Sequence, residues 1–264
     1  MLGRNHSGQT RGVLRIVAPK LCELHIHLRN EFGYAFTYEP LAKLFRGLEC
    51  PKLQSLSLTS SGGSSFSGYS QHGHAEQSCR AALIDFITHS DLTSKLRRLA
   101  VKEMSMTTTD MIIVLKSLLA ITDLTIHDVS VADGRGLSLF GGRSSSNHIL
   151  VQEFFQEFCV VREDATLPID SGHDITSPLL PNLYRMELKL ADIQEDVKEL
   201  RRMVHSRWDI SCSSPVTRLG CVVVLLTSDG GLPEDEWEDF HRYKKEGMLV
   251  KVQRVRGQQV IVGD

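Results

Sequence analysis

A spacing of apolar residues, L-x-x-L-x-L, recurs along most of this chain and constrains its fold more than any other sequence feature. Five copies are clear and one is looser, and their middle residues are Leu24, Leu56, Leu99, Leu124, Met186 and Leu219. Self-similar spacing of this kind indicates one supersecondary unit that is repeated along the chain. The intervals between the copies are uneven, so we expect an irregular array.

Each copy has the pattern of a short β-strand, because residues two apart on a strand point to the same face of a sheet. A proline stands two residues before the first apolar position in three copies, at Pro19, Pro51 and Pro181. Proline ends the preceding element and biases its predecessor toward extended backbone. We therefore expect these three strands to begin directly after a turn.

Amphipathic segments with helical spacing separate the strands, as a repeat that buries one face against its neighbours requires. The expected helix faces are Leu41, Leu44, Phe45 and Leu48; Leu83, Phe86 and Ile87, with Ser78 as N-cap; Ile112, Leu115, Leu118 and Leu119, behind Thr107 and Asp110; Leu150, Phe154 and Phe158; and Ile193, Val197, Leu200 and Val204, behind Asp192. A last helix, from Pro233 to Glu246, directs Trp237, Phe240 and Tyr243 or Lys244 inward. We expect it to close the end of the core.

Strict alternation of strands and helices predicts an α/β fold, an irregular leucine-rich-repeat solenoid of the ribonuclease-inhibitor-like kind. Parallel strands, about six in number, lie on the concave side and helices on the convex side. The expected organisation is a disordered N-terminal tail at 1–12, a single solenoid at 13–255 and a C-terminal tail at 256–264, with flexible insertions near 60–74, 128–146 and 162–178.

Several segments also carry more specific signatures. These are F-I-T-H-S at 86–90 before the strand at Leu96, L-L-P-N-L at 179–183, M-V-H-S-R-W at 203–208, and F-H-R-Y-K-K-E-G-M at 240–248. Together they resemble the C-terminal leucine-rich-repeat region of the fungal, mostly mushroom-type, F-box protein family. The resemblance runs from about Leu21 to Val252.

The resemblance implies a protein–protein interaction module, similar to the substrate-recognition part of an F-box (SCF-type) ubiquitin-ligase subunit. The F-box itself, which docks a Skp-type adaptor in that family, has no counterpart before Leu14. We therefore expect an unknown protein target, and adaptor binding only if an F-box is supplied elsewhere. The alternative is a truncated structural remnant that has no dedicated partner.

Charge and hydropathy exclude some partners. With 30 basic and 32 acidic residues the net charge is −2, which argues against nucleic-acid binding by bulk charge. The longest apolar run, Cys221–Leu226, is far shorter than the roughly 18 to 20 residues of a membrane-spanning helix. Met1–Gly12 lacks the apolar stretch of a signal peptide, so we expect a cytoplasmic or nuclear protein without a membrane partner.

Signatures of enzyme chemistry are weak. Gly136 and Gly141 have the spacing of the outer glycines of a phosphate-binding loop. Gly142-Arg143, however, replaces the Lys-Ser/Thr that such a loop uses to contact the phosphates and magnesium. Triad residue types at 171–174 are too close along one loop to form a triad unaided. We expect no enzyme activity and no cofactor.

Metal ligands and disulfides are not indicated either. Two histidine pairs, 25/27 and 72/74, have no identifiable third metal ligand. The six cysteines contain no C-x-x-C pair and are expected to be reduced. We expect no metal site.

The candidate partner-binding surface is the concave face, where the residues between the L-x-L positions point. The pattern assigns to it Glu23, His25, His27, Ser55, Ser57, Arg98, Lys102, Asp123, His127, Arg185, Glu187, Lys189 and Arg218. This face is polar and mixed in sign, so charge complementarity would select the partner. A merely solvated face is the alternative. In the sixth strand Val222 and Val224 would point outward, under the last helix and the tail.

Overall fold

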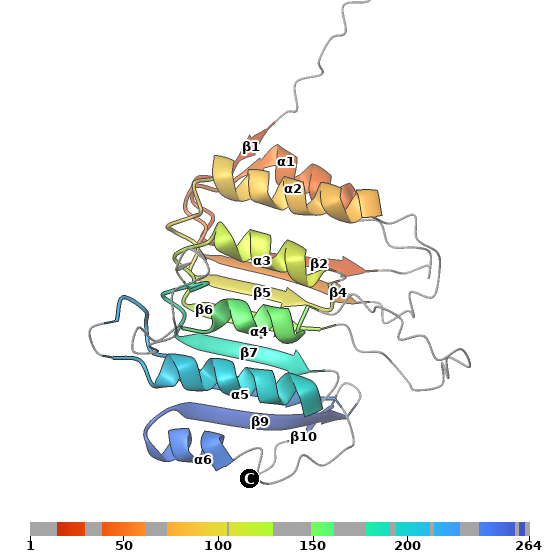
Figure 1. The fold of residues 1–264 in the computed structure, drawn as a ribbon. Coiled ribbons are helices and arrows are strands. Elements are labelled where there is room, and N and C mark those ends of the chain that lie inside the picture. Colours follow the sequence, from red (N-terminus) through yellow and green to blue (C-terminus); the bar gives the residue numbers. More distant parts are fainter. Residues whose placement is uncertain are drawn as a thin grey trace, which may run out of the picture.

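A computed structural model describes residues 15–29, 39–61, 73–104, 106–128, 149–160, 178–190, 194–211, 214–227, 238–256 and 259–261. An eight-stranded sheet, in the order β10-β9-β8-β7-β6-β5-β4-β2, organises the fold (Figure 1). Only β9 and β10 pair antiparallel in this sheet, and all its other neighbouring strands are parallel. The chain is therefore an α/β protein with a mostly parallel sheet.

Strands and helices alternate along most of the described chain. The strands are β1 (Ile16–Val17), β2 (Glu23–Arg29), β3 (Leu48–Glu49), β4 (Ser55–Ser61), β5 (Arg98–Lys102), β6 (Asp123–His127), β7 (Arg185–Leu190), β8 (Cys221–Leu226), β9 (Leu249–Arg256) and β10 (Gln259–Ile261). The helices are α1 (Glu39–Gly47), α2 (Gly73–His89), α3 (Thr108–Lys116), α4 (Gln152–Phe158), α5 (Gln194–Trp208) and α6 (Glu238–Lys245). β1 and β3 form a separate two-stranded parallel sheet.

The middle residues of five expected copies align in one row across the sheet. Leu24, Leu56, Leu99, Leu124 and Met186 are successive register partners on β2, β4, β5, β6 and β7. The residues two positions later form a second row on the same face, for example Val101 beside Ile126. These strand predictions are confirmed. The turns expected at 19–20, 51–52 and 181–182 are also present.

Helices cover only this apolar face. Figure 1 shows α1 to α6 in one layer in front of the strands, and no described helix lies behind them. Between the layers lie fully buried aromatic rings, among which Phe45 and Phe86 stack with their centroids 5.2 Å apart. Phe154, Phe155 and Phe158 line the buried side of α4. The core is thus a single layer between helices and strands.

The expected register of the sixth strand is wrong by three residues, so its inner and outer faces are exchanged. Val222 and Val224, predicted to point outward, are the register partners of Met186 and Leu188 and are fully buried in the core. The true sixth copy of the repeat is Leu219, Val222 and Val224. β8 is apolar at every position, so alternation could not identify its inner face.

Two helix faces also differ from their expected stripes. Leu44 and Leu119 are 42% and 54% exposed, and α3 buries Met111 and Val114 together with Leu115. Thr107 does cap α3, since its hydroxyl accepts a hydrogen bond of 3.1 Å from the Asp110 amide. The Asp110 carboxylate pairs with Arg80 of α2.

Other expected boundaries shift or lie outside the described residues. α2 begins at Gly73, so Ser78 lies within the helix instead of capping it. β4 and α2 extend into both ends of the 60–74 insertion, and β10 lies within the expected C-terminal tail. Several expected features lie outside the described residues. They are the N-terminal tail, most of the 128–146 and 162–178 insertions, His72, Asp192, Cys212 and Trp237.

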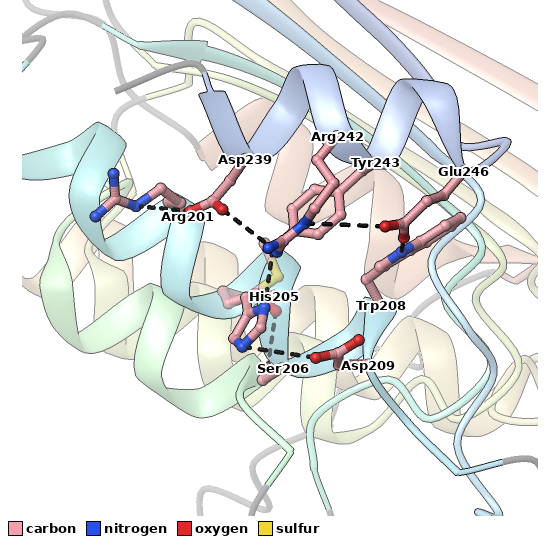
Figure 2. Close-up of polar contacts among 10 residues, drawn as sticks. Arg201, His205, Ser206, Trp208, Asp209, Asp239, Arg242, Tyr243 and Glu246 are labelled. Carbon is pink, nitrogen blue, oxygen red and sulfur yellow. Dashed lines mark hydrogen bonds and ion pairs between the residues drawn. The ribbon is translucent and has the colours of Figure 1, made fainter. Parts of the chain in front are cut away.

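α6 packs its aromatic side onto α5 and the end of the core. Phe240 and Tyr243 are buried, whereas Lys244 is exposed, which settles the alternative left open by the sequence. The Tyr243 hydroxyl lies 2.8 Å from His205 Nδ1 and accepts a hydrogen bond from Arg242 (Figure 2). Trp208 Nε1 donates to Glu246 at 2.7 Å. These contacts make α6 the C-terminal cover of the helix layer.

Arg207 ties together two segments that are distant in sequence. Its guanidinium is fully buried and donates to the carbonyl oxygens of Phe158, Leu179 and Leu180. Burial lowers the pKa of Arg207 to about 10. Phe158 ends α4, and the two leucines precede β7, so a single side chain of α5 satisfies carbonyl groups on both sides of residues 161–177.

Phe240→Ala should lower the free energy of unfolding by about 3–5 kcal/mol, because it removes a buried ring from the end of the core. His241→Ala, on the exposed side of the same helix, should change it by less than about 0.5 kcal/mol. Urea denaturation measures both values. Equal, small effects would show that α6 does not stabilise the core.

Arg207→Met should cost at least about 3 kcal/mol, because a side chain of similar length remains but three buried carbonyl groups lose their donor. Arg201→Met supplies the control, since Arg201 is partly exposed on the same helix and pairs only with Asp239 at 3.5 Å in the described chain. The same denaturation assay applies. A cost as small as that of the control would contradict the structural role of Arg207.

Candidate functional site

The side of the main sheet without helices is called here the open face. Its side chains form three rows across β2, β4, β5, β6, β7, β8 and β9, because parallel pairing keeps the strands in register. The rows are Glu23, Ser55, Arg98, Asp123, Arg185, Cys221 and Leu249; His25, Ser57, Ala100, Thr125, Glu187, Val223 and Lys251; and His27, Thr59, Lys102, His127, Lys189, Leu225 and Gln253.

Twelve of the thirteen predicted partner-binding residues lie in these rows, and Arg218 does not. Arg218 precedes β8, and its guanidinium stacks on the Trp208 ring at the end of α5, 3.5 Å from the ring centroid. Its placement on the concave face was wrong for the same reason as the register of β8. Thr59, Ala100, Thr125 and the β8 and β9 residues join the face although they were not predicted.

At the N-terminal side of the open face, one ion pair bridges an intervening strand. Arg98 of β5 reaches across β4 to Glu23 of β2, with a distance of 2.7 Å between Nη2 and Oε1. Ser55, which lies between them in the row, is buried. Both charged side chains are more than half exposed, so a partner could reach either charge.

The centre of the open face holds a denser charge cluster. Glu187 of β7 contacts His127 of β6 at 2.9 Å and Arg185 at 3.3 Å. Lys189 reaches across β6 to Glu103, 2.7 Å away, just after β5. The side chains of His127, Glu187 and Lys189 are only 14%, 20% and 12% exposed. The centre of this cluster is therefore largely buried within the surface.

Glu187 is held in its charged form by its neighbours. The hydrogen bond with His127 is the main cause that lowers the pKa of the Glu187 carboxyl, and the charges of His127 and Lys102 add to it. Burial alone would raise this pKa. The net effect is a carboxylate anchored between positive or hydrogen-bonding groups on two strands.

The face becomes apolar toward β8. Cys221 and Val223 point to the open face yet are buried, and burial raises the pKa of the Cys221 thiol. Gln253 of β9 is also buried, whereas Leu249 at the start of this strand is 62% exposed. The polar side chains of the open face are therefore concentrated on β2 to β7.

The histidine pair on β2 lies on one face of the strand but lacks, in the described part of the chain, the further ligands that a metal site needs. His25 and His27 both lie on the open face, and His25 Nε2 is 4.0 Å from Glu23. Within the described residues, no group of three or more His, Cys, Asp or Glu side chains could hold a metal ion. Five cysteines are described and all are free thiols, of which Cys22 is exposed.

A groove of about 480 Å³ lies near the ends of α1 and α2, away from the open face. It is lined by Arg15, Arg46, Asp85, Thr88 and His89. The Thr88 hydroxyl donates to the Ile84 carbonyl, and His89 Nε2 lies 2.8 Å from the Leu48 carbonyl. Because the hydroxyl and the imidazole each contact a different backbone carbonyl, Thr88 and His89 do not form a nucleophile–base pair with each other.

A scan of the chain against models of known protein families finds no match, and no curated protein matches the sequence. In the part of the chain that is described, no helix combines the length and hydropathy needed to cross a membrane.

Glu187→Gln should destabilise the protein at neutral pH and much less in acid. Because the folded-state pKa of Glu187 is lowered, its charge contributes stability above the unfolded pKa, about 4.3, and this contribution is lost as pH falls through the folded value. The difference between the wild type and the variant in unfolding free energy, measured from pH 7 to pH 3, should therefore shrink. A constant difference would contradict the coupling.

Proposed function

We propose that this chain is a protein–protein interaction module whose open face binds a protein target, as in the substrate-recognition part of an F-box ubiquitin-ligase subunit. The observation that carries the proposal is a mostly parallel sheet with one face under helices and the other lined, from β2 to β7, by rows of mainly polar and charged side chains.

The repeated strand–helix unit supports, within this proposal, an irregular leucine-rich-repeat solenoid with strands on its concave side. Repeats of this kind contact only their neighbours and create extended binding surfaces. The alternating order of elements and the shared register of Leu56, Leu99 and Leu124 agree with such a unit. A catalytic role and a cofactor are not part of the proposal.

The chemistry of the open face favours a protein target with charges of both signs. Acidic and basic residues alternate in part of this face: Asp123 of β6 lies between Arg98 of β5 and Arg185 of β7, while Glu23 pairs with Arg98 and Glu187 with Arg185. Phosphate backbones select for clustered positive charge, so this alternation disfavours a nucleic acid. Charge complementarity would determine which target binds and how fast it associates.

A Skp-type adaptor is a partner under this proposal only if an F-box is supplied by another chain or segment. The cytoplasm and the nucleus, where such ligases act, are the proposed locations. The competing hypothesis is a folded remnant without a dedicated partner, in which the same rows would be a solvated surface.

The test neutralises charges on the open face in the variant Arg98→Gln/Arg185→Gln. Both arginines are about half exposed, so the fold should be retained. The matched control, Lys43→Gln/Lys116→Gln, removes two exposed charges from the helix layer. Proteins captured by the wild type under crosslinking should be lost from the first variant and kept by the control.

Reconstituted binding of a captured target should also weaken at high salt, because exposed charges are screened. Identical target profiles for both variants would place any binding outside the open face. No reproducible target for the wild type would favour the remnant hypothesis.

A further inference from the structure

The two edges of the main sheet differ in how far neighbouring elements cover them. At the C-terminal end β9 pairs with β10, and α6 covers the core. At the other end β2 has β4 as its only neighbour among the described strands. The core-facing residues Leu24, Ile26 and Leu28 of β2 are only partly buried, whereas Leu56 and Leu58 of β4 are each 1% exposed.

Further apolar side chains are exposed in the elements at this end. Ile16 and Val17 of β1 are 64% and 55% exposed, and Leu44 of α1 is 42% exposed. Figure 1 shows β1 and α1 at the same extremity of the molecule. Exposed apolar side chains and the edge strand of a sheet are each typical of interaction surfaces.

The sequence of β2, E-L-H-I-H-L-R, is self-complementary when it is read in both directions. If two copies of Glu23–Arg29 run antiparallel and are centred on Ile26, leucine faces leucine and histidine faces histidine. Glu23 then lies opposite the partner's Arg29, and Arg29 lies opposite the partner's Glu23. Opposite charges in directly facing positions stabilise a strand pair.

Backbone direction agrees with this register. The Cys22 carbonyl accepts hydrogen bonds from the Gln54 and Ser55 amides, so it points toward β4. Carbonyl and amide directions alternate along a strand, so those of Glu23, His25 and Arg29 point away from β4. In the antiparallel register centred on Ile26 these residues occupy hydrogen-bonded positions, and Ile26 occupies a non-hydrogen-bonded one.

We propose that two copies of this chain associate through antiparallel pairing of β2 with the partner's β2, centred on Ile26. The contact is isologous, as two-fold symmetry requires, because the same strand serves both copies. It joins the two sheets edge to edge and places the partly buried leucines of both copies side by side. The two open faces then lie on the same side of a continuous sheet, independently of what those faces bind.

Charge reversal tests the facing pairs in the full chain. Glu23→Arg places arginines opposite each other twice per dimer, and Arg29→Glu does the same with carboxylates. Each single variant should raise the dimer dissociation constant about tenfold or more. The double variant Glu23→Arg/Arg29→Glu restores opposite charges and should recover most of the affinity, as measured by sedimentation velocity over a concentration series.

The double variant is also the control for effects within one copy. Glu23 pairs with Arg98 at 2.7 Å, and both Glu23→Arg variants lose that pair. Recovery in the double variant therefore reports on contacts between copies. A chain that stays monomeric at every concentration, or a dimer that neither single variant weakens, would overturn the proposal.

Disulfide trapping tests the register directly. Facing non-hydrogen-bonded residues have Cα atoms about 4.5 Å apart, within the range of a disulfide. In a Cys22→Ser background, which removes the exposed native thiol, Ile26→Cys should crosslink to a dimer under mild oxidation. Leu28→Cys alone should not crosslink, because residue 28 faces Leu24 of the partner. The double variant Leu24→Cys/Leu28→Cys should crosslink, because the two cysteines then face each other. A dimer trapped equally by Leu28→Cys alone would contradict this register.

Discussion

In-register parallel pairing is the constraint on which the rest of the molecule depends. Because Leu99, Leu124 and Met186 are register partners, every unit presents its apolar residues to the same side of the sheet. That side must be covered, and the helix that follows each strand provides the cover. The opposite side then receives the residues in between, so the charged rows of the open face are a direct consequence of the same register.

The faces of a strand could be predicted from the sequence only where apolar and polar residues alternate along it. Where apolar and polar residues alternate, as from Arg185 to Leu190, the strand, its inner face and its outer face were all predicted correctly. β8 is apolar throughout and offers no alternation, so its register, and with it the place of Arg218, was misassigned. Short helices posed a similar problem. Leu44 and Leu119 fit a helical spacing, but Leu44 lies on the exposed side of α1, and Leu119 is exposed beyond the end of α3.

The rows of the open face were predictable, but the contacts within them were not. Glu23 and Arg98 are 75 residues apart in sequence, and Glu103 and Lys189 are 86 apart. Each pair also reaches across an intervening strand, so neither follows from the spacing of its own segment. Arg207 is another such case, because its carbonyl partners belong to α4 and to the turn before β7. Long-range polar contacts depend on strand order, which spacing alone does not reveal.

A stack of repeated units must be closed at both ends, because each unit buries its apolar side only against a neighbour. Aromatic residues of α6 close one end, whereas at β2 the leucines remain partly accessible. An edge strand with unpaired backbone groups favours unspecific association, and charged residues at its ends limit such association. Parallel pairing of two β2 strands would place Glu23 opposite Glu23 and Arg29 opposite Arg29. A shifted antiparallel register would place these charged residues opposite leucines or histidines. The terminal charges of β2 therefore discriminate against these arrangements and favour the symmetric antiparallel one.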